Sequence, residues 1–320
     1  MVYAQLKYMW ASGSKEDSLN FLRTFATNLS RDLEAETTQR GQRSSVSKQK
    51  LDELARLLAR CYFKQGEWQM ELSDSWTTVR ESHALFLALT YILRSQRNVK
   101  DILHSYLLAT HFDPNWYKAW HTWALANFEV VNHLLNQAEA KAADVMGTTL
   151  VPHIIPAVQG SVHLWVHVAL IKPCVQGFFR SIALRSENSL QDTLRLLTLW
   201  FKFGAQDEVS HAIASGFSTV EVDTWLEVIP QVYYPFDYSP VPLTYFVQII
   251  ARIQTPNTNI RRNITSLLTD VGKHHPQALI YPLTVASKSP SALRKDAALA
   301  IMDRMKQHSP IIVEQVRSRI

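Results

Sequence analysis

Apolar residues recur at every third or fourth position through most of this chain. Four series show the spacing: Leu19, Leu22, Phe25, Leu29 and Leu33; Leu51, Leu54, Leu57 or Leu58, and Cys61; Leu190, Leu194, Leu197 and Phe201; and Leu293, Ala297, Ile301 and Met305. This spacing places the apolar side chains on one face of an α-helix. No clear run of alternating apolar and polar residues, which would indicate strands, separates the series. The pattern therefore predicts an all-α fold.

Many short amphipathic helices of this kind stack as antiparallel pairs, because each must bury its apolar stripe against the next. One repeat is visible in the sequence: Pro114 lies six residues before Trp120, as the closing proline of a tetratricopeptide (TPR) repeat precedes the next repeat's aromatic residue. Gly66 and the two residues after it fit the tight turn between the two helices of such a repeat. We predict an α-solenoid of degenerate TPR- or HEAT-like helical hairpins.

Composition narrows the class of protein. Lys and Arg total 33 against 28 Asp and Glu, and the basic residues are spread along the chain, so we expect no nucleic-acid partner. The longest apolar run has ten residues, from Ala84 to Leu93, whereas a membrane span needs about 20. Cys61 and Cys174 are far apart, which argues for a reducing compartment and against a disulfide framework or a zinc site. We expect a soluble cytoplasmic chain without a transmembrane segment.

Catalytic motifs are missing from the sequence. It contains neither a phosphate-binding glycine loop nor the signatures that kinases use for phosphoryl transfer and magnesium. His274 and His275 are adjacent, so on a helix they point in different directions and form a poor metal pair. We therefore predict no catalytic residue, no metal site and no ATP site, and we do not expect this chain by itself to be an enzyme.

One basic stripe is a candidate binding site. Arg56, Arg60 and Lys64 are spaced at i, i+4 and i+8, so they share one face of a helix. A bound polyanion would relieve their mutual repulsion and attract contacts from the arginine and lysine side chains. The spacing is equally consistent with a solvated helix face, which is the more common situation.

Several strings that combine rare aromatic residues with fixed polar neighbours resemble the FAT region of the TOR protein kinases. They occur in that family's order and cover most of the chain. They are Gly66 to Gln69, Trp116 to Trp120, Phe178 to Ser181, Leu190 to Arg195, Leu199 to Phe201, Asp223 to Leu226, Val228 to Gln231 and His275 to Ala286. The resemblance assigns residues 1–315 to a FAT-type helical-repeat region, truncated at both ends and stopping where the family's rapamycin-binding and kinase domains would begin.

The resemblance implies a function without catalysis. In TOR kinases this region wraps and regulates a serine/threonine kinase domain and contributes to complex assembly in nutrient-controlled growth signalling. The implied partners are the kinase domain and other subunits of a TOR complex. The implied location is the cytoplasm, with association to vacuolar or lysosomal membranes through the parent complex, and the nucleus. Two alternatives remain: a stand-alone TPR-like adaptor that binds peptides, and a gene whose complete product carries the kinase.

The family resemblance also implies a ligand. TOR kinases bind inositol hexakisphosphate in a pocket of this helical region that is lined by lysine and arginine. The matching positions here are Lys7, Arg60, Lys64 and Lys118, with Arg56 as an adjacent candidate. Part of the family's pocket comes from residues upstream of Met1. We therefore expect a partial site for inositol hexakisphosphate as a structural cofactor.

Three segments look foreign against the family pattern: residues 79–96, 160–176 and 232–248. The first and third begin with Val, and all three end in Gln. A codon that starts with GT encodes Val and CAG encodes Gln, which are the consensus ends of a short intron. One hypothesis is that in-frame introns were retained in the gene and that residues 316–320 are a read-through tail. The alternative is a set of genuine lineage-specific loops.

Overall fold

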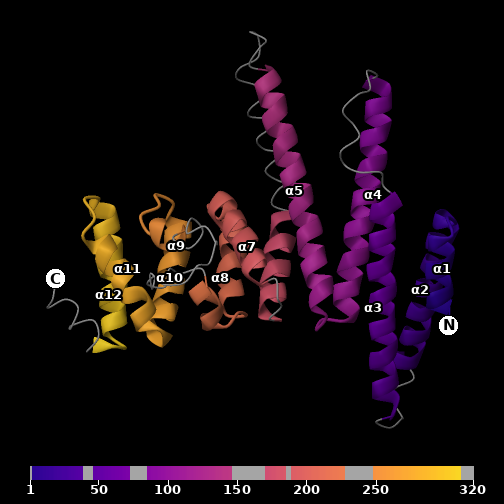
Figure 1. Ribbon diagram of the computed structural model, residues 1–320, viewed down its shortest axis with the longest axis horizontal. Helices are drawn as coiled ribbons and strands as arrows, with labels where there is room; N and C mark the ends of the chain where they lie inside the picture. The colour runs from indigo at the N-terminus through magenta and orange to yellow at the C-terminus, as the bar shows by residue number, and fades with distance from the viewer. Residues whose placement is uncertain are drawn as a thin grey trace, which may run out of the picture. The chain divides into compact units, whose positions relative to one another are not determined.

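The computed structural model describes residues 2–38, 46–72, 85–145, 170–184, 189–227 and 248–310, and every regular element in these ranges is helical (Figure 1). This confirms the all-α prediction. The chain forms two compact units, residues 1–126 and residues 127–320.

Among its described residues, the first unit contains four helices and the start of a fifth. They are α1 (Val2–Ala11), α2 (Lys15–Thr38), α3 (Val46–Leu72), α4 (Leu85–Phe112) and the beginning of α5 (Tyr117–Val145). From α1 to α4, each helix packs against the one that follows it in the chain. Helices α2 and α3 run antiparallel, since ion pairs join Lys15 to Glu71 near one end and Glu36 to Lys50 near the other.

Helix α3 is buried on two sides. Toward α1 and α2, its residues Leu58, Cys61 and Trp68 enter a core that also contains Leu6, Leu19, Leu22, Ala26 and Leu29. Toward α4 and α5, Phe63 packs with Ile102, Tyr106, Ala109, Ala119, Trp123 and Ala126. A helix that is covered by both of its neighbours is the structural unit of a solenoid, in which each repeat contacts the next.

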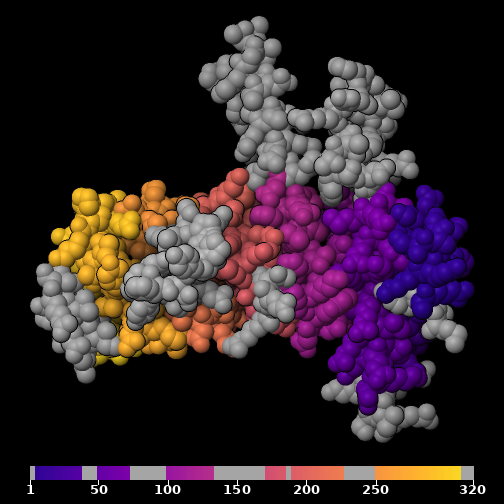
Figure 2. All heavy atoms as spheres, viewed as in Figure 1, coloured from indigo at the N-terminus to yellow at the C-terminus, as the bar shows by residue number. Residues whose placement is uncertain are grey.

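The second unit continues the same arrangement. It contains the rest of α5, a helix over residues 170–183, α7 (Ser189–Phe203), α8 (Asp207–Phe217), the 3₁₀ helix η2 (Val222–Glu227), α9 (Gln248–Ala251), α10 (Thr258–His274), α11 (Pro276–Ser287) and α12 (Ala292–Lys306). The α7–α8, α8–α10, α10–α11 and α11–α12 pairs are in contact. Helices α10 to α12 are coloured orange to yellow in the space-filling view of Figure 2.

Local sequence signals explain where several of these helices begin. The side chain of Asn257 accepts a hydrogen bond from the backbone N–H of Ile260 and so caps α10. Helix α11 begins with Pro276, which lacks the N–H that would be unpaired there. The core among α7, α8 and η2 is aromatic around Phe217, whose ring meets those of Trp200 and Trp225 edge to face at 5.3 and 5.6 Å.

Pro114 lies between two helices, as the closing proline of a TPR repeat does, whereas the turn predicted at Gly66 is wrong. Residues 113–116 join α4 to α5, and the indole N–H of Trp120 donates to the carbonyl oxygen of Pro114 at 2.9 Å. Gly66, by contrast, lies inside α3 and is buried. A Cβ atom there would lie 2.7 Å from Cε1 of Tyr106, so the residue is small because α4 approaches closely.

Each of the three proposed insertions lies partly outside the described residues. Within them, residues 85–96 belong to α4, residues 170–176 are helical, and Gln248 is the first residue of α9. The proposed tail, residues 316–320, is also outside the described ranges. The intron hypothesis therefore stays a prediction.

Candidate functional site

The basic stripe predicted on α3 is part of a longer charged stripe. Arg60 and Lys64 are followed by Glu67 and Glu71, and the four residues are spaced at i, i+4, i+7 and i+11 along the helix. This spacing keeps them on one face. Arg60 is exposed, whereas the side chains of Lys64 and Glu67 retain 27% and 33% of their accessible surface. The stripe is thus positive at Arg60 and Lys64 and negative at Glu67 and Glu71, and it is half-buried at Lys64 and Glu67.

The carboxylate of Glu67 forms ion pairs with two of the lysines predicted to bind the ligand. The Lys64 Nζ atom lies 2.8 Å from Glu67 Oε2, one helical turn away. The Lys118 Nζ atom, from the first turn of α5, lies 3.7 Å from Glu67 Oε1. The fold therefore brings Lys64 and Lys118 to one carboxylate, with one oxygen facing each lysine.

Aromatic rings hold the same two lysines. The ammonium group of Lys64 lies 5.8 Å from the ring centroid of Trp68, and that of Lys118 lies 5.0 Å from the ring centroid of Phe63. Both distances are within the range of a cation–π attraction. Trp68 and Phe63 are buried, so each lysine is supported by a ring that the core fixes in place.

A second ion pair lies beside this cluster and ties α2 to α3. The Trp68 ring stacks on Trp10 with centroids 4.3 Å apart, and Lys15 lies 5.4 Å from the Trp10 centroid. Lys15 Nζ donates to Glu71 Oε1 at 2.9 Å. The hydrogen bond from Lys15 holds the pKa of Glu71 below its usual value.

Two of the four predicted site residues are thus brought together. Arg60 is exposed on α3 one turn before Lys64. Lys7 is exposed on α1 one turn before Trp10, which stacks on Trp68. The convergence of Arg60 and Lys7 with the two lysines on one ligand stays a prediction.

Glu67 is not among the site residues predicted from the sequence. A signal for it exists: Glu67 follows Lys64 by three residues, and opposite charges at this spacing on a helix pair. The turn predicted at Gly66 to Trp68 would instead take Glu67 off the helix face that carries the basic stripe.

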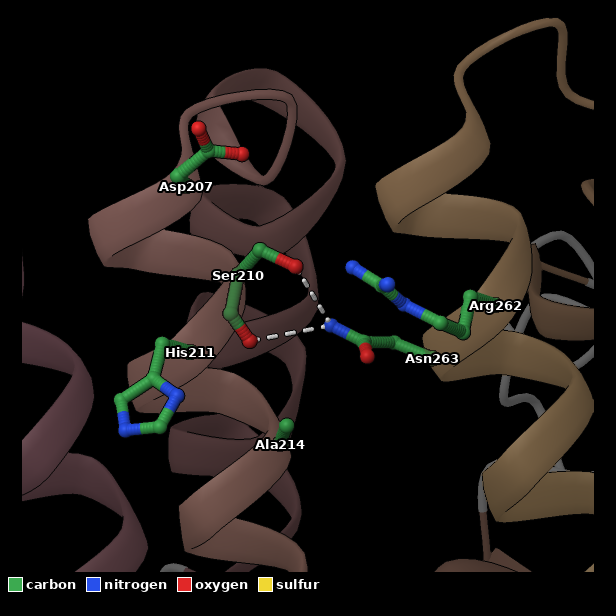
Figure 3. A pocket seen from close by; sticks show the side chains of 6 residues that line it. All are labelled: Asp207, Ser210, His211, Ala214, Arg262 and Asn263. Carbon is green, nitrogen blue, oxygen red and sulfur yellow. Dashed lines mark hydrogen bonds between the residues drawn. The ribbon is translucent and has the colours of Figure 1, made fainter.

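A separate open depression of about 430 Å³ lies between α8 and α10 (Figure 3). Its lining residues are Asp207, Ser210, His211, Ala214, Arg262 and Asn263. Asn263 Nδ2 donates to the carbonyl oxygen and to Oγ of Ser210, both at 3.1 Å. Arg262 donates to Asn259 Oδ1, and Asn259 Nδ2 donates to Asp207 Oδ1, each at 2.8 Å. These bonds explain the polar lining as a seam that joins the two helices.

The cysteines and histidines fit structural roles. Burial raises the pKa of the Cys61 thiol to about 12 and raises that of Cys174 as well, so both stay protonated at neutral pH. His275 Nε2 lies 2.6 Å from Asp223 Oδ1, whereas His274 Nδ1 lies 2.9 Å from the carbonyl oxygen of Asp270. The adjacent histidines therefore face different partners, as predicted. No three His, Cys, Asp or Glu side chains among the described residues are placed to hold a metal ion.

Comparison with known proteins identifies the helical array. The FAT domain family matches residues 1–97 and 88–198. The chain belongs to the FAT domain family. Similarity to TOR kinases extends over nearly the whole chain, as predicted from the strings of aromatic and polar residues. The chain is 40% identical to the serine/threonine-protein kinase TOR2 of Saccharomyces cerevisiae and 38% identical to tor1 of Schizosaccharomyces pombe, each over 98% of its length.

Identity to the mTor kinase of Drosophila melanogaster is 39%, again over 98% of this chain. The chain spans only 11 to 12% of the length of these three relatives. It therefore corresponds to a FAT-containing part of proteins that are much longer. In the described part of the FAT chain, no helix has both the length and the apolar character that crossing a bilayer requires.

Proposed function

We propose that this chain is a non-catalytic helical scaffold of a TOR serine/threonine kinase. In this role it supports and regulates the kinase domain and contributes to assembly of a TOR complex in growth signalling. The observation that carries the proposal is the similarity to TOR kinases over 98% of the chain, together with the FAT match.

Features of the fold support a scaffold role. Helices that pack in sequence order leave one face of each helix available to other proteins. On α11, Tyr281 and Val285 are exposed at 60% and 54%, one turn apart. Exposed apolar residues that are adjacent on a helix favour a protein partner. The two cysteines are free and buried, which supports a cytoplasmic or nuclear location and, for the parent complex, the cytoplasmic side of vacuolar or lysosomal membranes.

Co-purification tests the scaffold role. The 320-residue chain would be co-expressed with a tagged segment of a TOR kinase that carries its rapamycin-binding and kinase domains. We expect the two to elute as one complex and the Tyr281→Asp/Val285→Asp variant to lose that complex while keeping its helical circular dichroism. Independent elution of the wild-type chain and the kinase segment would contradict a supporting role.

We further propose that Lys7, Arg60, Lys64 and Lys118 bind inositol hexakisphosphate as a structural cofactor. The support is the position of Lys64 and Lys118 on a common carboxylate and the place of Arg60 one turn along α3. The rings of Trp68 and Phe63 already restrict the two lysines, so a ligand loses less side-chain entropy when it binds them.

Thermal stabilisation tests the polyphosphate site. Inositol hexakisphosphate should raise the melting temperature of the wild-type chain, because a ligand that binds the folded state stabilises it. The Arg60→Ala/Lys64→Ala variant should lose this shift. A matched control, Lys295→Ala/Arg304→Ala, removes the same charge from exposed positions on α12 and should keep it. If the shift survives in the first variant, the site is misassigned.

A further inference from the structure

A carboxylate lies at the centre of a site proposed to bind an anion. Each oxygen of Glu67 faces one lysine, at 2.8 Å from Lys64 Nζ and 3.7 Å from Lys118 Nζ. An anionic ligand that contacts both lysines must displace this carboxylate or bind beside it. Either path opposes binding, since like charges repel and each lysine gives up part of an existing ion pair.

We propose that Glu67 is an internal competitor of the ligand, which occupies Lys64 and Lys118 when the site is empty and so sets its affinity for polyphosphate. This inference rests on the polyphosphate function proposed above. It assigns to Glu67 a role in affinity that neither the basic stripe nor the resemblance to TOR kinases predicts.

The surroundings of the lysines favour competition over a purely positioning role. If Glu67 alone held the two lysines, its loss would release them. However, Lys64 lies over Trp68 and Lys118 lies over Phe63, and both rings are at least 96% buried. These rings remain when the carboxylate is neutralised. The charge of Glu67 therefore has a larger effect on the ligand than on the placement of the lysines.

The position of Glu67 also makes the carboxylate accessible to displacement. Its side chain keeps 33% of its accessible surface, and that of Lys118 keeps 60%. Ion pairs with this exposure are weak and are screened by salt. A polyphosphate with several charged groups can thus replace them. The pairs should still reduce the affinity by roughly tenfold at low salt, if two exposed pairs are lost on binding.

Calorimetric titration of the full 320-residue chain with inositol hexakisphosphate tests the proposal. The Glu67→Gln variant keeps the size of the side chain and removes its charge. We expect its Kd to be roughly tenfold lower than that of the wild-type chain at low salt, with a smaller gain at high salt, because screening weakens the competition.

A matched control is available in the second unit. Asp270 pairs with Lys273 at 2.8 Å with the same i, i+3 spacing as Glu67 and Lys64. The Asp270→Asn variant therefore changes the net charge of the chain by the same amount and breaks a similar ion pair. This variant should leave the Kd unchanged. If Asp270→Asn gained as much affinity as Glu67→Gln, the gain would be a general charge effect and the proposal would be overturned.

The remaining outcomes separate this inference from the function on which it rests. If the wild-type chain binds, Arg60→Ala/Lys64→Ala does not, and Glu67→Gln binds equally or more weakly, then Glu67 does not compete and the polyphosphate function stands. If neither the wild-type chain nor Glu67→Gln binds, both proposals fail. Binding by Glu67→Gln where the wild-type chain shows none supports both.

Discussion

Four consecutive residues of α3 make four different contacts. Gly66 lies against the ring of Tyr106, and Glu67 faces two lysines. Trp68 stacks on Trp10, and Gln69 accepts a hydrogen bond from Ser105 Oγ at 2.9 Å. Successive residues on an α-helix are rotated by about 100°, so a string of four points in nearly every direction around the axis. In a helix that is covered on two sides, each direction meets a different neighbour.

Replacement of Gly66 by alanine tests the close approach of α3 and α4. Alanine favours a helix by about 1 kcal/mol over glycine, which alone would stabilise α3. The added Cβ atom, however, would lie 2.7, 2.9 and 3.0 Å from three ring atoms of the buried Tyr106. Overpacking costs typically 1–3 kcal/mol, so we expect a net loss of roughly 1 kcal/mol in urea denaturation.

The double variant Gly66→Ala/Tyr106→Leu is the control for this clash. In the Tyr106→Leu background, Gly66→Ala should lower the free energy of unfolding by less than it does in the wild-type chain. The smaller leucine side chain leaves room for the added Cβ atom. A Gly66→Ala chain that is as stable as the wild type, or more stable, would be incompatible with the described helix contact.

At the scale of elements, a buried polar contact joins two helices of the second unit. Ser181 Oγ, in the helix over residues 170–183, donates to Asp192 Oδ2 in α7 at 2.5 Å. Arg195 Nη1 donates to the other carboxylate oxygen at 3.2 Å. Asp192 is fully buried, although the apolar series through α7 predicts only leucines and Phe201 on the buried face. The charge is tolerated because both oxygens have donors and because it lies in the first turn of α7.

The Asp192→Ala variant tests how much this contact stabilises the unit. It leaves the Ser181 hydroxyl without this acceptor in a fully buried position and removes the partner of Arg195. Loss of one partner from a buried charged network costs about 3 kcal/mol. Asp296→Ala, an exposed change on α12, should stay within about 0.5 kcal/mol. Equal denaturation midpoints for the two variants would contradict a stabilising role for Asp192.

On the scale of the full chain, the alignment with TOR kinases spans the three segments that look foreign. The aligned region covers 98% of the chain and therefore includes at least part of residues 79–96, 160–176 and 232–248. An alignment can cross an insertion as a gap, so the spliced transcript decides between a retained intron and a loop.

We predict that the spliced transcript lacks these three segments. The expected outcome, from sequencing between the codon for Thr78 and a point beyond that for Gln315, is a message shortened by three in-frame deletions. A message that retains all three would identify them as lineage-specific parts of the protein. A junction in place of the codons for residues 316–320 would likewise confirm the read-through tail.

The fold class and the family follow from the amino-acid sequence alone. The period of the apolar residues follows from backbone geometry, so it predicts helices wherever it occurs, and the aromatic strings predicted the FAT region of a TOR kinase. It also predicted that Arg60 and Lys64 share a helix face, because that relation is local. That Gly66 lies within a helix and that Lys118, from α5, meets Glu67 is known only from the packing of the helices. Those contacts depend on which neighbouring helix covers each face of α3. The spacing of apolar residues indicates that a face is buried, but it is the same whichever helix covers that face.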